Sequence, residues 1–186
     1  MRSFGIAFVL LAVGCEKPAG PAPAGSASAA PAAATPNADA LLKEGAPAPD
    51  LTATAHNGEK VSLASLKGKP VVVYFYPKDD TPGCTVEAKG IKEHWADLSG
   101  TGAVVIGVST DDEASHKAFA EKYELPFLLV PDPDARIAGM FGVPLRNNHA
   151  SRVTFLIGKD GKIAKVYPAV KPDGHAAELL AAIRTL

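Results

Sequence analysis

Residues 71–85 read VVVYFYPKDDTPGCT, and this stretch decides the fold. Its first six residues are apolar β-formers without interruption, which is typical of a strand covered on both faces of a sheet. Pro77 interrupts that pattern, and a helical pattern begins at Cys84. The stretch therefore predicts a buried strand, a short turn and a helix that has a cysteine near its first residue.

The position of Cys84 favours a reactive thiol. The first N–H groups of a helix have no partner within the helix, and the helix dipole favours a negative charge beside them. A thiol placed there is shifted toward thiolate, which is the form that reacts. Cys15 is the only other cysteine, so one disulfide is the maximum. With no C-x-x-C pair, the sequence does not support a thioredoxin-type dithiol centre or a thiolate zinc site.

The N-terminal residues form a segment of a different kind. Arg2 gives a basic start, and residues 4–13 are apolar but too short to span a bilayer. The segment that ends at Cys15 is similar to a bacterial lipoprotein signal, although Ala12 stands where such signals usually carry a larger aliphatic residue. An ordinary signal peptide and an uncleaved apolar start are the alternatives. We expect a signal peptide over residues 1–14, a lipid on Cys15, and a place in the bacterial cell envelope, lipid-anchored on the periplasmic side, or secreted.

Two further segments follow from composition. Residues 15–40 are mostly Ala, Pro, Gly and Ser, cannot bury a core, and predict a disordered tether. Residues 41–186 have the length of one ordinary domain with a sizeable core. The net charge of −1 gives no reason to expect nucleic acid or an acidic membrane surface as a partner. Membrane contact is expected only through the lipid anchor.

The domain alternates between strand and helix patterns. We expect a β-hairpin over 51–63, strands at 71–76, 104–109 and 128–130, helices at 84–98, 111–123 and 134–141, a second hairpin over 153–167 and a final helix at 175–184. Alternating strands and helices place helices on both faces of a sheet, and the second hairpin adds an antiparallel pair. The fold class is therefore α/β, compatible with a thioredoxin-like fold that has a central mixed β-sheet flanked by helices and an N-terminal β-hairpin.

Apolar spacing also predicts which helix residues face the core. In the first helix these are Val86, Ile91, Trp95 and Leu98, and in the second Ala114, Ala118, Phe119 and Tyr123. The five histidines, at positions 56, 94, 116, 149 and 175, show no metal-ligand spacing and are interpreted as ordinary surface or loop residues. No cofactor and no metal are expected.

The cysteine motif resembles the active-site signature of the peroxiredoxins. The signature is Pro77-x-x-x-Thr81-x-x-Cys84, and the longer stretch 74–85 is similar to the bacterioferritin-comigratory, or Q-type, branch of that family. The resemblance covers nearly all of residues 41–186. It includes residues 107–109 and the strand that begins with Arg152.

This resemblance implies a thiol peroxidase that reduces hydrogen peroxide and organic hydroperoxides through a sulfenic acid on Cys84. By the same resemblance, Thr81 places its hydroxyl beside the sulfur and the peroxide, Pro77 shields the thiolate, and Arg152 supplies a cation. Helix dipole, cation and preorganised donors all suit a thiolate that attacks an O–O bond. Glu87 either hydrogen-bonds the arginine or is a solvated helix residue.

The sequence departs from the Q-type pattern at Lys89, where many members carry a resolving cysteine. We therefore expect a one-cysteine enzyme, active as a monomer and regenerated by an external thiol, either a thioredoxin-like protein or a small thiol. An unlipidated Cys15 that reaches back to the site is the exception. The alternative functions are a peroxide-sensing lipoprotein and a thiol–disulfide oxidoreductase on the same fold.

Overall fold

A computed structural model of the chain describes residues 40–186. The predicted signal peptide, Cys15 and all of the predicted tether except its last residue lie outside the described residues. None of the helices in the described range combines the length and the apolar character that a bilayer crossing needs.

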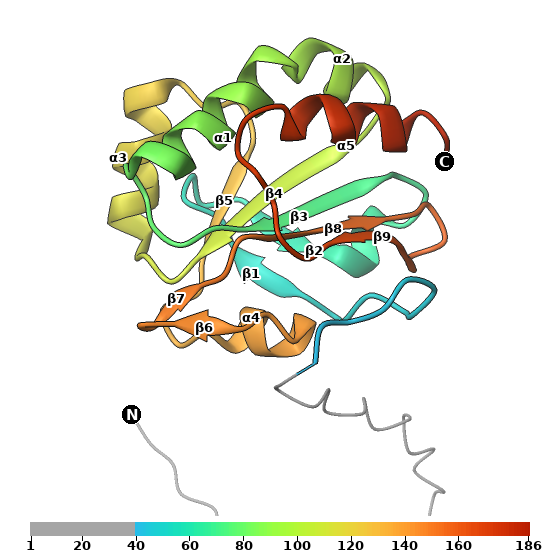
Figure 1. The fold of residues 1–186 in the computed structure, drawn as a ribbon, viewed down its shortest axis with the longest axis horizontal. Helices are drawn as coiled ribbons and strands as arrows, with labels where there is room; N and C mark the ends of the chain where they lie inside the picture. Colours follow the sequence, from blue (N-terminus) through green and yellow to red (C-terminus); the bar gives the residue numbers. More distant parts are fainter. Residues whose placement is uncertain (1–39) are drawn as a thin grey trace, which may run out of the picture. The chain divides into compact units, whose positions relative to one another are not determined.

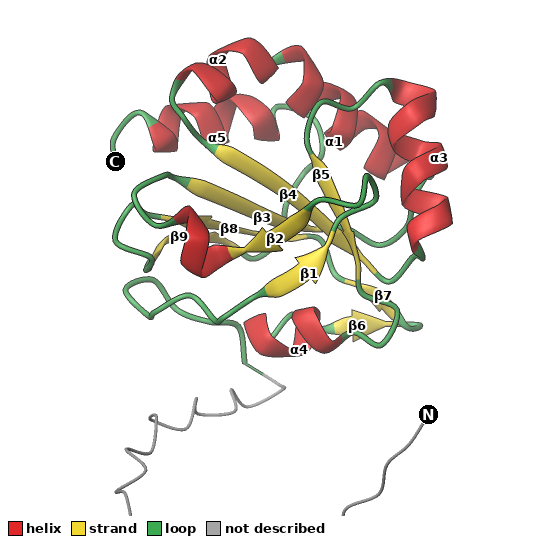
Figure 2. Ribbon diagram, turned by 180° about the vertical axis from the view of Figure 1, so that it is seen from behind, coloured by secondary structure: helices red, strands yellow, loops and turns green. Residues whose placement is uncertain are grey.

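The fold is built on a five-stranded sheet with the order β5-β4-β3-β8-β9 (Figures 1 and 2). Its strands are β3 (Val71–Phe75), β4 (Val104–Ser109), β5 (Leu128–Pro131), β8 (Val153–Ile157) and β9 (Ile163–Tyr167). Strands β3, β4 and β5 run parallel, whereas β8 is antiparallel to β3 and β9 is antiparallel to β8. The predicted mixed sheet and its closing hairpin are confirmed.

Helices cover both faces of the sheet. They are α1 (Pro82–Glu93), α2 (Trp95–Gly100), α3 (Glu113–Tyr123), α4 (Arg136–Phe141) and α5 (His175–Ile183). Residues of α1, α2, α3 and α5 pack in one hydrophobic cluster. Residues of α4 pack in the other, with the hairpin of β1 (Thr52–Thr54) and β2 (Lys60–Ser62) and the 3₁₀ helix η1 (Leu63–Leu66). The predicted α/β, thioredoxin-like architecture with its N-terminal hairpin is confirmed.

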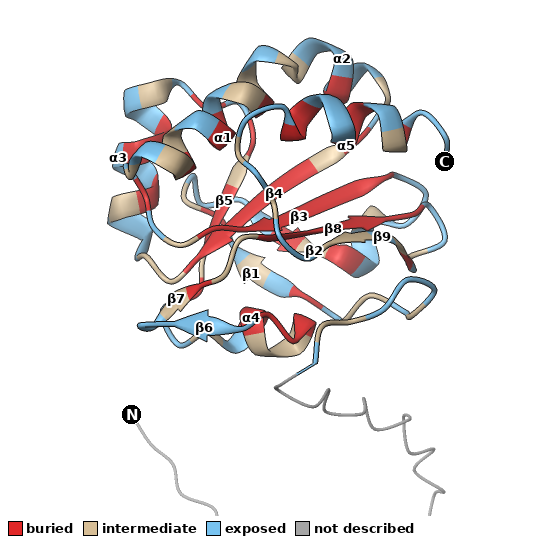
Figure 3. Ribbon diagram, viewed as in Figure 1, coloured by how far each residue is buried: buried red, intermediate tan, exposed pale blue. Residues whose placement is uncertain are grey.

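The central strand β3 divides its side chains between the two clusters. Val71, Val73 and Phe75 enter the cluster of α4, and Val72 and Tyr74 enter the cluster of α1 and α5. Successive strand residues point to opposite faces, so a strand covered on both faces needs apolar residues at every position. Figure 3 shows β3 and β8 as buried along their whole length. The sequence of β3 is apolar without interruption because both of its faces are buried.

The first predicted helix is two helices. Helix α1 ends where His94 adopts φ −95° and ψ 8°, and α2 begins at Trp95. The prediction that Val86 faces the core is wrong, because this residue is 47% exposed. The buried positions of α1 are Cys84, Glu87, Ala88 and Ile91, which follow the three- and four-residue spacing of one helical face.

The predicted core face of α3 is also partly wrong. Asp112 caps the helix by accepting a hydrogen bond from the backbone N–H of Ser115, as its acidic start indicated. Ala114 and Ala118 are exposed, so their predicted core positions are wrong. His116 occupies the core face with Phe119 and Ala120 instead.

Two of the histidines interpreted as surface or loop residues are buried. His116 is 0% exposed and His175 is 1% exposed. Buried imidazoles need hydrogen-bond partners, and His175 has Thr154 on one ring nitrogen and Glu178 on the other.

A short hairpin between α4 and β8 was not predicted. It consists of β6 (Leu145–Arg146) and β7 (His149–Ala150), joined by two asparagines with φ of 50° and 63°. Two consecutive residues at positive φ are typical of a type I′ turn, which asparagine tolerates better than most residues.

Alanine substitutions at two glycines, Gly107 and Gly90, test the packing described above. A Cβ atom at Gly107 in β4 would lie 2.7 Å from the Tyr74 hydroxyl and 2.7 Å from Leu129, both buried, whereas a Cβ atom at Gly90 in α1 would meet open space. We expect Gly107→Ala to lower the free energy of unfolding by about 1–3 kcal/mol through overpacking. Gly90→Ala should raise it by about 0.5–1 kcal/mol through helix propensity. Urea denaturation measures both, and a neutral Gly107→Ala would contradict the close contact with Tyr74.

Candidate active site

The candidate site lies where β3 ends and α1 begins. The chain leaves β3 at Phe75, passes through residues 76–81 and enters α1 at Pro82, so Cys84 is the third residue of the helix. Proline suits this first helical turn because its missing N–H would have no partner there. The first bond of the helix joins Thr85 N–H to the Thr81 carbonyl, so the N–H of Cys84 precedes it.

The sheet register brings Arg152 to the same place. Val153, the first residue of β8, is opposite Phe75, the last residue of β3. Arg152 therefore stands beside the point where the chain leaves the sheet toward Cys84. The antiparallel pairing of β8 thus joins two positions that are 68 residues apart in the sequence.

Arg152 contacts both functional partners on α1. Its Nη2 lies 3.3 Å from the Sγ of Cys84, and its Nη1 donates a hydrogen bond to Oε2 of Glu87. The three side chains are enclosed, with exposed fractions of 2% for Cys84, 0% for the Glu87 side chain and 16% for the Arg152 side chain. The carboxylate therefore holds the guanidinium in a fixed orientation against the sulfur.

Burial sets the charge state of this pair. It raises the pKa of Glu87 from its ordinary value of 4.5 to about 7, and the positive charge and hydrogen bond of Arg152 limit the rise. Although burial acts to lower the pKa of Arg152, the charge of Glu87 and the neighbouring Cys84 raise it, so the guanidinium stays protonated. Oε1 of Glu87 is buried with no hydrogen-bond partner in the described part of the chain. Of the two open alternatives for Glu87, the structure supports the hydrogen bond with the arginine.

Thr81 and Gly83 complete the first turn around the sulfur. Thr81 precedes α1 with an extended backbone, and its hydroxyl donates a 3.0 Å hydrogen bond to the carbonyl of Lys78. A Cβ atom at Gly83 would lie 3.2 Å from Nη2 of Arg152 and 3.7 Å from Cγ of Pro172. Glycine at this position leaves the space in which Arg152 approaches Cys84.

Pro77 and Arg152 both line a groove of about 490 Å³. Its other walls come from the β6–β7 hairpin and from residues 168–171, which follow β9. The lining contains three cationic side chains, Arg146, Arg152 and Lys171, and no carboxylate. An electropositive groove with apolar walls therefore opens next to the enclosed thiol.

Similarity to known proteins decides the family. The family model described as AhpC/TSA matches residues 45–166. A bcp-type peroxiredoxin of Coxiella burnetii is 45% identical over 146 residues, which cover 75% of this chain and 97% of that protein. The chain belongs to the AhpC/TSA family.

Solved structures of related proteins support the same family. A peroxidoxin BcpB structure from Mycobacterium tuberculosis has a TM-score of 0.72 and 31% identity, covering 78% of this chain and 98% of that one. A structure on alkyl peroxide reduction by the Xanthomonas campestris bacterioferritin comigratory protein has a TM-score of 0.72 and 32% identity, covering 77% and 98%. This protein is therefore a peroxiredoxin of the bacterioferritin-comigratory, Q-type branch, a thiol-dependent peroxidase with a thioredoxin-like fold.

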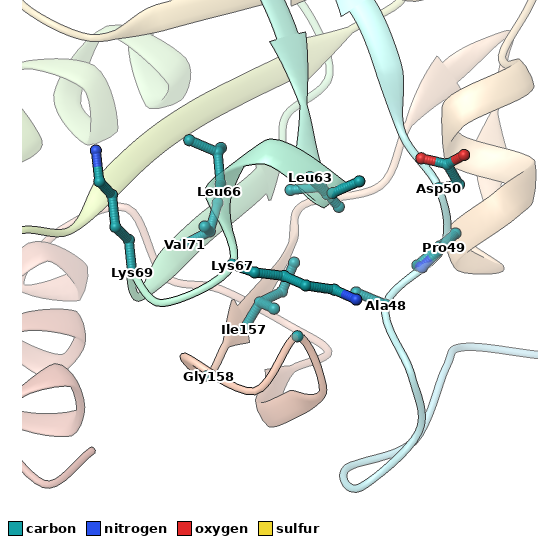
Figure 4. Close-up of a pocket in the computed structure, with 12 residues that line it drawn as sticks. Ala48, Pro49, Asp50, Leu63, Leu66, Lys67, Lys69, Val71, Ile157 and Gly158 are labelled. Atoms are coloured by element: carbon teal, nitrogen blue, oxygen red, sulfur yellow. The ribbon is translucent and has the colours of Figure 1, made fainter.

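A second pocket of the peroxiredoxin lies near the start of β3 (Figure 4). It has a volume of about 230 Å³, and its lining includes Leu63, Leu66 and Val71 together with Lys67 and Lys69. Val71 begins β3, whereas Cys84 follows its end, so this pocket is separate from the thiol. Across residues 40–186, no three His, Cys, Asp or Glu side chains are grouped to hold a metal ion.

The raised pKa of Glu87 predicts a pH-dependent stability. Because the folded pKa is above the unfolded one, the contribution of Glu87 is complete below pH 4.5 and is lost as pH rises through about 7. We expect the difference in free energy of unfolding between wild type and Glu87→Gln to fall by about 1–3 kcal/mol from pH 5 to pH 8.

Denaturant titrations at several pH values measure this difference. Glu93→Gln, on the exposed side of the same helix, is the matched control. A difference that does not change with pH for Glu87→Gln would contradict the raised pKa.

Proposed function

We propose that this protein is a one-cysteine peroxidase in which Cys84 attacks the peroxide and Arg152 stabilises both the thiolate and the transition state. The observation that carries this proposal is the 3.3 Å contact between Nη2 of Arg152 and Sγ of Cys84, with Glu87 holding the guanidinium. A permanently charged group next to sulfur favours the thiolate over the thiol.

The oxidation step follows from this geometry. The thiolate of Cys84 attacks the terminal oxygen of ROOH, an S–O bond forms, the O–O bond breaks, and RO⁻ leaves to take up a proton as ROH. The thiol proton left at ionisation, so the products are Cys84 sulfenic acid and an alcohol or water. Negative charge spreads over both oxygens in the transition state, where preorganised donors lower the barrier. The guanidinium and the N–H of Cys84 are such donors.

Thr81 and Pro77 take supporting roles in this proposal. Thr81 uses its hydroxyl hydrogen on the carbonyl of Lys78, so its oxygen lone pairs remain available to accept a hydrogen bond from a peroxide O–H. Pro77 lines the groove beside Arg152 and limits the access of water to the sulfur. The hydrogen bond to Lys78 fixes the orientation of the hydroxyl. Its contact with a peroxide is part of what we propose.

Reduction of the sulfenic acid needs a thiol from another molecule. Cys84 is the one cysteine in the described part of the chain, and the position five residues later is Lys89. One external thiol forms a mixed disulfide with Cys84 and releases water, and a second thiol releases the Cys84 thiolate. A thioredoxin-like protein or a small thiol fits this step.

The groove supports organic hydroperoxides as substrates beside hydrogen peroxide. Its volume of about 490 Å³ and its apolar walls accommodate an organic chain, and its cations suit an anionic group on that chain. The Xanthomonas campestris protein, whose described activity is alkyl peroxide reduction, has the same fold at 32% identity.

We also propose the cell envelope as the place of action. The lipoprotein-like signal before Cys15 supports a chain that is lipid-anchored on the periplasmic side, with residues 15–40 as a tether for a monomeric domain. An ordinary signal peptide would give a secreted protein instead.

Turnover with a panel of reductants tests the one-cysteine proposal. We expect residues 15–186 to consume hydrogen peroxide with dithiothreitol or thioredoxin, and Cys84→Ser to abolish the activity. Arg152→Lys should lower the rate constant of Cys84 oxidation by about 100-fold, because a flexible ammonium replaces a fixed planar donor. Full turnover in Cys84→Ser would refute the proposal.

Intact mass after one equivalent of peroxide identifies the oxidised species. An oxygen adduct or, with added thiol, a mixed disulfide supports external regeneration. A loss of two hydrogens from a monomer would instead show a disulfide with Cys15 and would overturn it.

Replacement of Cys15 tests the anchor. When the full chain is expressed in a Gram-negative bacterium, we expect the wild type in the membrane fraction and Cys15→Ser in the soluble fraction. Both should have the same peroxidase activity per molecule, because Cys15 has no part in the proposed reaction. Equal partition of the two variants would contradict lipidation.

A further inference from the structure

The segment between Pro77 and Thr81 is attached to α3 through a buried carboxylate. Asp79 is 7% exposed, and three hydroxyl or ring donors surround its two oxygens. Tyr76 donates its hydroxyl to Oδ1 at 2.7 Å, while the Ser115 hydroxyl and Nδ1 of His116 each lie 2.8 Å from Oδ2. Two of these three donors belong to α3, which the chain reaches more than 30 residues later.

The backbone of the same segment is fixed as well. The N–H of Asp79 donates to Oδ2 of Asp111 at 2.9 Å, just before α3. The next residue, Asp80, has φ 56°, a left-handed conformation that costs energy for a non-glycine residue. Its carboxylate accepts hydrogen bonds from Lys122 and from the Tyr123 hydroxyl, both 2.6 Å long, at the far end of α3. Two consecutive aspartates thus hold the segment at two points of one helix.

His116 makes its hydrogen bonds from one side only. Its Nδ1 faces Asp79 and lies 3.3 Å from the Tyr76 hydroxyl, while its Nε2 is buried with no partner among residues 40–186. Because Oδ2 of Asp79 can only accept while ionised, Nδ1 carries the proton. The bonds from His116, Tyr76 and Ser115 lower the pKa of Asp79 despite its burial, which keeps the carboxylate charged.

We propose that Asp79 and His116 are positioning residues of the peroxidase. They hold the segment 77–81 so that Pro77 and Thr81 keep their positions relative to Cys84 in the first turn of α1. Neither side chain touches Sγ in the structure. Their effect is on the rate at which a peroxide reacts with Cys84, and it rests on the roles proposed above for Pro77 and Thr81.

The location of the pair favours this role over general stabilisation. A single buried hydrogen bond adds little net stability, but removal of one partner is costly because the other is left unsatisfied. Here the pair connects the segment that leads into the active site to a helix on the same face of the sheet. A displacement of about 1 Å of reacting groups is enough to slow a reaction by about 100-fold.

Two substitutions of His116 separate the hydrogen bond from the ring. In His116→Asn the amide nitrogen replaces Nδ1 and can still donate to Asp79, whereas in His116→Gln the amide lies near the place of Nε2. We expect the second-order rate constant of Cys84 oxidation by hydrogen peroxide to fall at least about 10-fold in His116→Gln and to stay within about 3-fold in His116→Asn. Stopped-flow competition kinetics on residues 15–186 measures it.

Alkylation of Cys84 by iodoacetamide provides the second measurement. It needs an accessible thiolate but no peroxide held by Thr81, so a positioning defect lowers peroxide reactivity without lowering alkylation to the same extent. Ile163→Val, in the core near the turn between β8 and β9, is a destabilised control and should keep the wild-type ratio of the two rates. Equal losses in both reactions, or equal rates for His116→Gln and His116→Asn, would overturn the proposal.

Ser115→Ala keeps the experiment decisive if His116→Gln does not fold. It removes one of the three donors to Asp79 at a half-buried helix position that alanine suits. We expect a fall of about 3-fold in the peroxide rate with unchanged alkylation, and an unchanged peroxide rate would overturn the proposal. Failure of the proposed function would be distinct, because it would appear as peroxide turnover in Cys84→Ser.

Discussion

The contact between Arg152 and Cys84 depends on the register of β8 against β3. Val153 pairs with Phe75, so the residue before β8 lies beside the point where the chain leaves β3. A one-residue slip would send Arg152 to the other face of the sheet, away from α1. Since β8 is buried on both faces, its register is held by the antiparallel pairs with its two neighbours, β3 and β9. The chemistry of the thiol thus rests on backbone hydrogen bonds in the centre of the sheet.

The sequence predicts the sheet well because the physical signal is local. Val71 to Phe75 are apolar at every position because the strand contributes side chains to both cores. Cys84 stands out for a local reason as well, since a turn and a helix start surround it. Arg152 was reached only through resemblance, because its pairing with the thiol is made across 68 residues by strand register.

The errors of the sequence analysis share one cause. Val86 is apolar but lies on the exposed face of α1, and His116 is polar but lies on the buried face of α3. Hydrophobicity alone therefore placed both on the wrong side. A sharper signal was present, since His116 is three and four residues before Phe119 and Ala120 and so shares their face. Its partner Asp79 sits in a run of polar loop residues and looks solvated in sequence. Such buried polar pairs become visible only when two segments are brought together in the fold.

Gly83 has a consequence for how sequence can vary at this site. A Cβ atom there would lie 3.2 Å from Nη2 of Arg152, which is tighter than most such contacts, so the guanidinium would have to shift by a few tenths of an ångström. Glycine is otherwise a poor choice inside a helical turn, and alanine there would stabilise an isolated α1. Alanine at this position would therefore favour the helix, whereas glycine favours the close approach of the Arg152 guanidinium to the sulfur.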